Sequence, residues 1–325
     1  MTAGPVVVLG DLNIDALLAV PAYPAPGGDA LATASHLGAG GSAANAAIVL
    51  AKLGQPSRLL ARLGADAWAD AALRALELAG VDTQTIQRDE AAPTGLFFIP
   101  VTPDGERTMF GLRGANVRLD PGAVAPALAG ARWLHVSGYA LLEAPQRDAA
   151  LRALAWAQAQ GVPASLDVGR FPALQQPDLV RRLLPGLAVC VLDGKAARAV
   201  VGEVADPAQA AEALAAAGVG LAALTLGAQG AVLRSRSHTV RQPPFPVDVV
   251  DTTGAGDAFS AGLIFAQLRG LSLPAAAALA AALGALAVQT WGAGPALPGR
   301  AEAAAFLRAR RTSPNAALDE TLAAL

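Results

Sequence analysis

The stretch "VVDTTGAGDAFSAG", residues 249–262, joins two apolar runs of different kinds through a glycine-rich turn. The run "VDVV", residues 247–250, is typical of a β-strand. Residues 259–266 instead carry apolar side chains at helical spacing. The segment Gly254 to Asp257 is therefore predicted to open a helix directly after a strand. Glycines cost backbone entropy, so a cluster of them indicates that the backbone itself must approach another group closely.

A helix that begins at Gly254, Ala255 and Gly256 offers unpaired N–H groups and a positive dipole end, and both attract anions. Asp257 is predicted to lie beside this anion hole, where the dipole favours an ionised carboxylate. An anion pocket with a fixed carboxylate suits phosphoryl transfer. The amides stabilise charge on the moving group, and the carboxylate accepts the proton of an attacking hydroxyl. The stretch alone fits a glycine turn with an acidic helix cap equally well.

Outward from this stretch, strand-like and helix-like segments alternate along the chain. The strand-like segments are short apolar runs bounded by glycine: residues 4–11, 57–64, 132–138, 162–169, 186–193 and 221–227. The segments between them carry helical periodicity: residues 40–54, 66–80, 144–161 and 207–218. This alternation predicts an α/β fold, with a mostly parallel central sheet covered by helices on both faces.

Two insertions interrupt the alternation and lack helical periodicity. Both place proline and glycine turns between short apolar runs, and "TPDG" at 102–105 is a good hairpin turn. We expect these insertions to form a small antiparallel sheet, or lid, over the main sheet. The predicted domains are a core of residues 4–11, 38–92 and 117–311, a lid of residues 12–37 and 93–116, and a tail or short terminal helix at 312–325.

The composition excludes several classes of function. The chain has 325 residues, and its formal net charge of −2 gives no basic excess for binding nucleic acid. Its most apolar stretch, from Pro274, is mostly alanine and too short for the roughly 20 apolar residues of a membrane span, so we expect a buried helix. The one cysteine, Cys190, excludes an internal disulfide, and three scattered histidines predict no metal cluster. No signal peptide is apparent, and a cytoplasmic location is expected.

Five segments in order resemble the ribokinase-like (phosphofructokinase-B type, PfkB) carbohydrate kinase family. Residues 251–259 match the signature D-T-x-G-A-G-D-x-F at every fixed position. The other four matches are "GDLNIDALLAV" at 10–20, "GGSAANAAIVLAKLG" at 40–54, "TLGAQGA" at 225–231 and "ALAVQTWGAGPALP" at 285–298. The resemblance spans nearly the whole chain. It implies a three-layer α/β/α sandwich with a small β-sheet lid, and an ATP- and Mg²⁺-dependent sugar kinase.

The resemblance also implies a role for each matching residue. Asp257 is the catalytic base, and Gly254, Ala255 and Gly256 form the anion hole. The residues implied to bind the sugar are Asn13, Asp15, Gly40, Gly41, Ser42 and Asn45. The residues implied to contact the nucleotide are Thr225, Gly227, Gly230 and Gly256. Asp251 and Thr253 match positions that supply a monovalent-cation site, such as one for K⁺, in some relatives.

The chain departs from the family pattern in two places. Ribokinases commonly have lysine where this chain has Ser42. The family motif N-x-x-E, whose glutamate helps to organise magnesium and phosphate, is replaced by Asp193 at the asparagine position and Ala196 at the glutamate position. Asp193 could hold a magnesium-bound water, because Mg²⁺ keeps several waters and uses few carboxylates. Lys195 is either a phosphate contact or a solvated side chain.

The identity of the acceptor stays open at this stage. A ribose-like free sugar is favoured, and a nucleoside is an alternative because "GGSAAN" also occurs in nucleoside kinases of the family. A 2-keto-3-deoxy sugar acid is another, because "SLDVGRFPAL" at 165–174 resembles such kinases and offers Arg170, while Arg113 could meet an acidic substrate. A different class is a catalytically weak protein that binds sugar or nucleotide. We also expect a homodimer formed through the lid, because a small sheet leaves an edge and an apolar face to cover.

Overall fold

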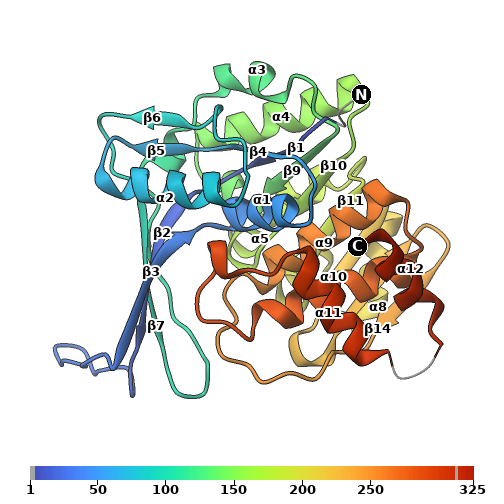
Figure 1. Cartoon of the computed structure of the whole chain (residues 1–325). Coiled ribbons are helices and arrows are strands. Elements are labelled where there is room, and N and C mark those ends of the chain that lie inside the picture. Colours follow the sequence, from blue (N-terminus) through green and yellow to red (C-terminus); the bar gives the residue numbers. More distant parts are fainter. Residues whose placement is uncertain (1–3, 312–313) are drawn as a thin grey trace.

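The computed structural model describes residues 4–311 and 314–325, and an eight-stranded sheet crosses its centre (Figure 1). The strand order is β14-β13-β12-β11-β10-β9-β1-β4, parallel from β4 through β12 and antiparallel at β13 and β14. The bounds are β1 Val6–Leu9, β4 Ser57–Leu60, β9 Trp133–Ser137, β10 Ala164–Asp167, β11 Val189–Asp193, β12 Leu221–Thr225, β13 Ala231–Ser235 and β14 Thr239–Gln242. The predicted mostly parallel sheet is confirmed.

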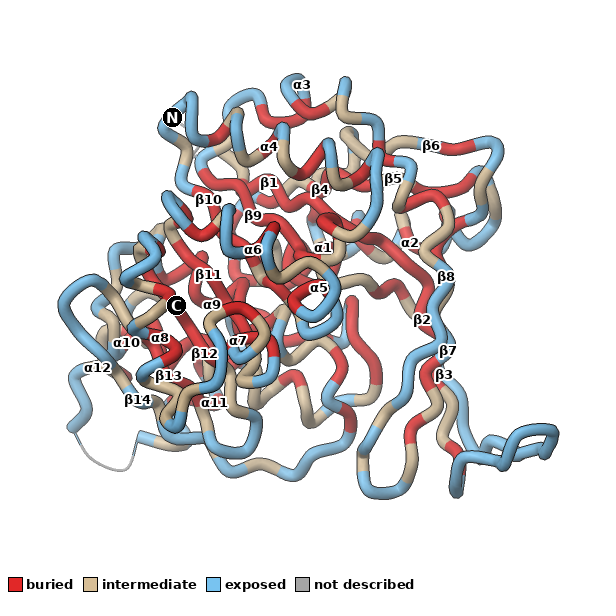
Figure 2. Tube along the Cα trace, turned by 180° about the vertical axis from the view of Figure 1, so that it is seen from behind, coloured by how far each residue is buried: buried red, intermediate tan, exposed pale blue. Residues whose placement is uncertain are grey.

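Helices cover both faces of this sheet because its strands are apolar on both sides. In β1, Val6 and Val8 pack into one core, and Val7 and Leu9 into the other. The first core is covered by α1 Ser42–Lys52, α2 Ala67–Leu78, α9 Ala255–Arg269, α10 Leu273–Ala287 and α11 Arg300–Arg310. The second is covered by α3 Val124–Leu128, α4 Gln146–Gln160, α5 Arg170–Gln175, α6 Pro177–Leu183, α7 Gly194–Val201 and α8 Pro207–Ala216. The three-layer sandwich is confirmed, and Figure 2 shows its buried central strands.

A smaller sheet projects from one end of the sandwich (Figure 1). Its order is β3-β2-β7-β8, with β2 Asn13–Ala19, β3 Ala34–Gly40, β7 Gly95–Val101 and β8 Phe110–Leu112. The expectation of a purely antiparallel lid was wrong, because β2 and β7 pair in parallel. Each insertion folds into its own antiparallel hairpin, and the first strands of the two hairpins leave the core in the same direction. β3 continues to Gly40, so the predicted boundary at 37/38 falls inside a strand; the domain division stays a prediction.

Two further elements differ from the sequence prediction. The segment 57–64, expected as one strand, divides at Ala61 into β4 and β5 Arg62–Gly64, and β5 pairs with β6 Gln87–Asp89. At the C-terminus, α12 Ala316–Ala324 packs on α10, where the Thr321 hydroxyl donates to the Ala275 carbonyl at 3.1 Å. The terminal segment is therefore helical from residue 316 to 324, and residues 312–313 lie outside the described part.

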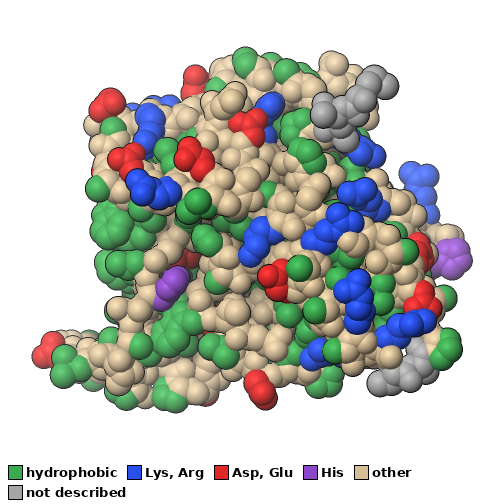
Figure 3. Space-filling model, in the orientation of Figure 1, with side chains coloured by type: hydrophobic (Ala, Val, Ile, Leu, Met, Phe, Trp, Pro, Cys, Tyr) green, Lys and Arg blue, Asp and Glu red, His purple; other side chains and the backbone are tan. Residues whose placement is uncertain are grey.

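The alanine-rich stretch from Pro274 forms α10 in the first core, as predicted. No helix among the described residues is long and apolar enough to cross a membrane. Acidic and basic side chains are interspersed over the face in Figure 3.

Candidate active site

The carboxyl ends of the parallel strands and the start of α9 open into one pocket of about 540 Å³, and β7 of the small sheet forms another wall. Most of the predicted site residues line it: Asn13, Asp15, Gly41, Ser42, Asn45, Asp193, Thr225, Thr253, Gly254, Gly256 and Asp257. Five predicted residues lie outside the lining: Gly40, Ala255, Gly227, Gly230 and Asp251. Polar groups at strand ends in an open α/β sheet are where ligands bind.

Helix α9 begins directly after Gly254, as the sequence predicts, and its two glycines have different structural roles. Gly254 has φ 79°, and a Cβ on it would lie 2.8 Å from the Leu297 Cδ2, so this position excludes a side chain. A Cβ on Gly256 would meet nothing within 4 Å, and Gly256 lines the pocket. A larger residue at 256 would therefore place its side chain in the space beside the helix N-terminus.

Asp257 lies one position further along α9 and is oriented by α1. The Asn45 Nδ2 donates to the Asp257 Oδ2 at 2.7 Å, and the Asn45 Oδ1 accepts from the Gly294 N–H at 3.0 Å. Burial raises the pKa of Asp257, against the opposing hydrogen bonds from Asn45 and Ser42. The expectation that the environment simply favours the ionised form was therefore incomplete, because desolvation outweighs the stabilising contacts.

Asp15 projects from β2 into the same pocket, and Gly40 makes room for its carboxylate. A Cβ on Gly40 would lie 2.0 Å from the Asp15 Oδ2, so Gly40 serves the pocket without lining it. Gly41 has φ 98°, and a Cβ there would lie 2.4 Å from the Asp11 carbonyl oxygen. Burial raises the pKa of Asp15 to about 7, with further repulsion from Asp257 and Asp251 and an opposing effect of Arg107.

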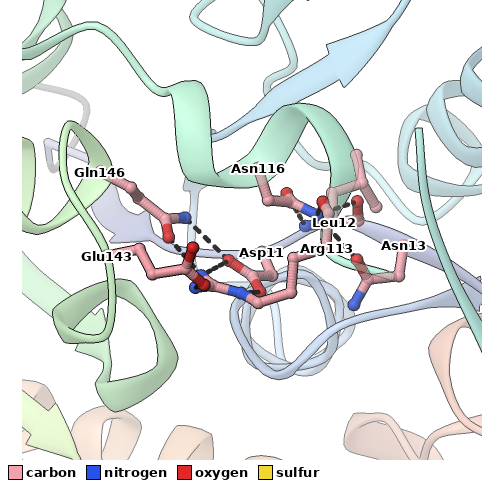
Figure 4. Close-up of polar contacts among 7 residues, drawn as sticks. All are labelled: Asp11, Leu12, Asn13, Arg113, Asn116, Glu143 and Gln146. Carbon is pink, nitrogen blue, oxygen red and sulfur yellow. Dashed lines mark hydrogen bonds and ion pairs between the residues drawn. The ribbon is translucent and has the colours of Figure 1, made fainter. Parts of the chain in front are cut away.

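Arg113 is held by Asp11, a pocket residue that the sequence analysis missed (Figure 4). Its Nε and Nη2 donate to the two carboxylate oxygens of Asp11, both at 2.9 Å, and its side chain is 12% exposed. Gln146 of α4 also donates to the Asp11 Oδ1, at 2.7 Å. The guanidinium fork is thus already occupied, and it leaves no matching pair of donors for an acidic substrate.

The pocket is also lined by Asp193, at the end of β11. Its Oδ1 accepts from the backbone N–H groups of Lys195 and Ala196, at 2.8 and 2.7 Å, and so caps α7. Its Oδ2 accepts from the Arg170 Nε at 3.0 Å. Thr225 lies opposite Asp193 in the register of β12 and lines the pocket. Ala196 is fully buried in the second core, so the position where the family has a glutamate faces apolar side chains.

Asp251 acts within the protein rather than on the pocket surface. Its Oδ1 accepts from the backbone N–H and the hydroxyl of Thr253, at 2.9 and 2.7 Å, and its Oδ2 accepts from the Gly292 N–H at 3.0 Å. These bonds tie the loop before α9 to the segment that follows α10. In the described part of the chain, no three His, Cys, Asp or Glu side chains converge in a way that could hold a metal ion by themselves.

Three further pocket residues escaped the sequence analysis as site residues: Asp167, Tyr139 and Arg107. Asp167 ends β10, and its Oδ2 accepts from the Ser260 hydroxyl at 2.8 Å. Burial raises the pKa of Asp167 to about 7, and repulsion from Asp257 adds to this. A signal for Asp167 was present in the sequence, since this aspartate ends an apolar strand as Asp193 does. Arg107 has no such signal; it comes from the hairpin of the small sheet and donates to the Thr252 hydroxyl.

Comparisons with known proteins agree with this fold. A family model described as "pfkB family carbohydrate kinase" matches residues 4–300. An ATP-dependent ribose-1-phosphate kinase from Halopiger xanaduensis is 32% identical over 311 residues, which cover 94% of this chain and 98% of that protein. A ribokinase from Haemophilus influenzae is 30% identical over 306 residues, which cover 92% of this chain and 97% of that protein.

A solved structure of Arabidopsis thaliana ribokinase complexed with ribose and ATP has the same fold, with a TM-score of 0.79 and 26% sequence identity. The match covers 94% of this chain and 99% of that chain. Together with the pocket at the start of α9, these likenesses show that the chain belongs to the PfkB family of carbohydrate kinases, phosphotransferases with an alcohol group as acceptor.

Proposed function

We propose that this chain transfers the terminal phosphoryl group of ATP to an alcohol group of a small, ribose-like sugar. The observation that carries the proposal is one pocket that contains Asp257 at the start of α9 together with Asn13 and Asp15 on the small sheet. The relatives and the neighbouring structure that act on ribose or ribose 1-phosphate support the choice of sugar.

In the proposed reaction, Asn13 and Asp15 hold sugar hydroxyls, and Asp257 accepts the proton of the attacking one. Asn45 donates to the Oδ2 of Asp257 and so fixes the orientation of the carboxylate that acts as the base. The raised pKa of Asp257 brings it closer to working pH, which makes it a better proton acceptor. The N–H groups at the start of α9, beside the open Gly256, stabilise charge on the phosphoryl group.

Mg²⁺ bound with ATP would supply charge neutralisation of the phosphates. Asp193 and Asp167 would hold it, because they end the adjacent strands β11 and β10 and both line the pocket. Two carboxylates with waters and phosphate oxygens suit the preference of Mg²⁺ for a partly hydrated shell. In this proposal Asp167 supplies the carboxylate that Ala196 does not.

The contacts of the two arginines that the sequence analysis offered for an acidic substrate favour a neutral sugar over a sugar acid. Arg113 is occupied by Asp11, and Arg170 is paired with Asp193. A nucleoside remains the second candidate within the family. A protein that only binds sugar or nucleotide is the candidate of another class, and the intact site around Asp257 argues against it.

The proposal includes three finer expectations. We keep K⁺ as a candidate activator at the Asp251–Thr253 loop, and the cytoplasm as the location. We also propose a homodimer through the outer face of the small sheet. There, one register row brings together Leu37, Ala16, Phe98 and Phe110, and its three large side chains are 58%, 49% and 62% exposed. Figure 3 shows hydrophobic side chains gathered at the edge of the view where the small sheet meets the core.

The test is an ATP-consumption screen over free sugars, sugar acids and nucleosides, with Asp257→Asn as the inactive control. Turnover of a ribose-like sugar by the native protein alone supports the proposal. Turnover of nucleosides or sugar acids instead would reassign the acceptor. Binding of a sugar in a thermal-shift assay without any ATP turnover would favour the non-catalytic candidate.

A further inference from the structure

Asn116 is a fully buried amide at the base of the small sheet, in the short helix η1 Gly114–Arg118. Its Oδ1 accepts from the Leu12 N–H at 2.9 Å, and its Nδ2 lies 3.2 Å from the Leu12 carbonyl oxygen. Its Nδ2 also donates to the Arg113 carbonyl at 3.0 Å. A backbone N–H needs an acceptor and a carbonyl needs a donor, so these contacts allow only one orientation of the Asn116 amide.

The fixed Nδ2 of Asn116 in turn determines the orientation of Asn13. It donates to the Asn13 Oδ1 at 2.7 Å, and Figure 4 shows the two amides meeting in this way. The oxygen of Asn13 is thereby committed to the protein. Its Nδ2 has no hydrogen-bond partner among the described residues, although Asn13 is only 4% exposed and lines the pocket. The side chain of Asn13 therefore presents a donor to the pocket.

The residues around Asn13 and Asn116 hold these two side chains in place. A Cβ on Gly95 of β7 would lie 2.2 Å from the Asn13 Oδ1 and 2.6 Å from the Asn116 Nδ2, so only glycine leaves space for the bond. The turn that carries Asn116 is anchored through Arg113 to Asp11, at the end of β1.

We propose that Asn116 is a positioning residue for substrate recognition: it holds Asn13 so that its Nδ2 donates to a sugar hydroxyl beside the acceptor Asp15. Asn13 and Asp15 alternate with Ile14 along β2 and so share one face of the strand. The pocket then offers a donor next to an acceptor, which matches two neighbouring hydroxyls and rejects an analogue that lacks one of them. This inference rests on the proposed function, because it needs a sugar that Asn13 binds.

The test is a double-mutant cycle with Asn116→Ala, Asn13→Ala and the double variant, assayed on the sugar that the screen identifies. Loss of one oriented hydrogen bond predicts that Asn116→Ala raises KM for the sugar about 10-fold, while KM for ATP stays unchanged. In the Asn13→Ala background, Asn116→Ala should have no further effect on KM. Asn13→Asp keeps the bond from Asn116 but replaces the donor with an acceptor, so it should raise KM for the sugar as well.

Deoxy analogues of the sugar give a readout that a merely structural role would not change. The native protein should discriminate strongly against the deoxy analogue that lacks the hydroxyl bound by Asn13. Asn116→Ala should lose the discrimination against this analogue only. If Asn116→Ala fails to fold, Gly95→Ala is the substitute, because it disturbs the bond between Asn116 and Asn13 while Asn116 is retained. The effect of Gly95→Ala on KM for the sugar should likewise vanish in the Asn13→Ala background. If the effects of Asn116→Ala and Asn13→Ala on KM are additive in an enzyme that phosphorylates the sugar, the inference about Asn116 is wrong and the proposed function stands. A native protein that phosphorylates no sugar would overturn the proposed function and this inference with it.

Discussion

Asp15 shows how the burial of a single carboxyl couples recognition to pH. Its pKa is raised from 3.8 to about 7, first by burial and then by Asp257 and Asp251. A sugar hydroxyl donates to the ionised form, so the proton and the sugar compete for the same carboxylate. We predict that KM for the sugar increases as the pH falls through about 7, measured at saturating Mg-ATP. A KM for the sugar that is independent of pH over this range would show that Asp15 does not accept a hydroxyl in its ionised form.

Substitutions of Gly254 and Gly256 can be compared directly, because a Cβ would face open space at Gly256 but not at Gly254. Gly256→Val should preserve the melting temperature but lower turnover with ATP, since its side chain would occupy the space at the start of α9. Gly254→Ala should lower the melting temperature, since it combines φ 79° with a contact of 2.8 Å to Leu297. Thermal melts and steady-state kinetics on both variants check this. Equal turnover by Gly256→Val and the native protein would show that the phosphate does not lie there.

At the scale of the element, Asp193 has a structural and a proposed catalytic role that two substitutions separate. Asp193→Ala removes the cap of α7 and should cost about 1 kcal/mol of stability. Asp193→Asn keeps an oxygen for the cap and removes the charge. Both variants should need more magnesium for half-maximal activity, with KM for the sugar changed less. An unchanged magnesium requirement in both variants would exclude Asp193 from the magnesium shell.

The elements of the sandwich could be predicted because their signals are local. Strand runs such as residues 186–193 and the glycine turn before α9 are visible within a few residues of sequence. The parallel pairing of β2 with β7 could not be predicted, because it depends on two separate insertions meeting in space. The division of residues 57–64 at Ala61 also depends on tertiary contact, since β5 pairs with β6 more than 20 residues further on rather than with the main sheet.

At the scale of the whole molecule, the residues of the site could be predicted from local motifs, whereas the contacts that orient them could not. The family motifs indicated Asp257, Asp15 and Asn45, and these lie together in one pocket. The contacts that orient them are long-range: Asn13 and Asn116 are 103 residues apart, and Asp11 and Arg113 are 102 apart. Neither the periodicity of the sequence nor the spacing of its motifs indicates which residues so far apart contact each other.

The exposed row on the outer face of the small sheet leads to a prediction about assembly. If a second copy covers Phe98 and Phe110, the protein should sediment as a dimer at micromolar concentration, because exposed apolar surface of this kind favours association. Phe110→Asp should shift it to monomers, and the exposed Leu78→Asp on α2 is the control for added charge alone. A native protein that sediments as a monomer would refute the proposed dimer.

The most direct test of the central claim, that Asp257 is the base of a sugar kinase, is the turnover of Asp257→Asn on the sugar that the screen identifies. The asparagine keeps the shape of the side chain and an oxygen for the Asn45 amide, but it no longer accepts a proton. We predict that kcat falls by at least roughly 10²-fold, while KM for the sugar and for ATP changes much less. Near-normal kcat in this variant would contradict the account.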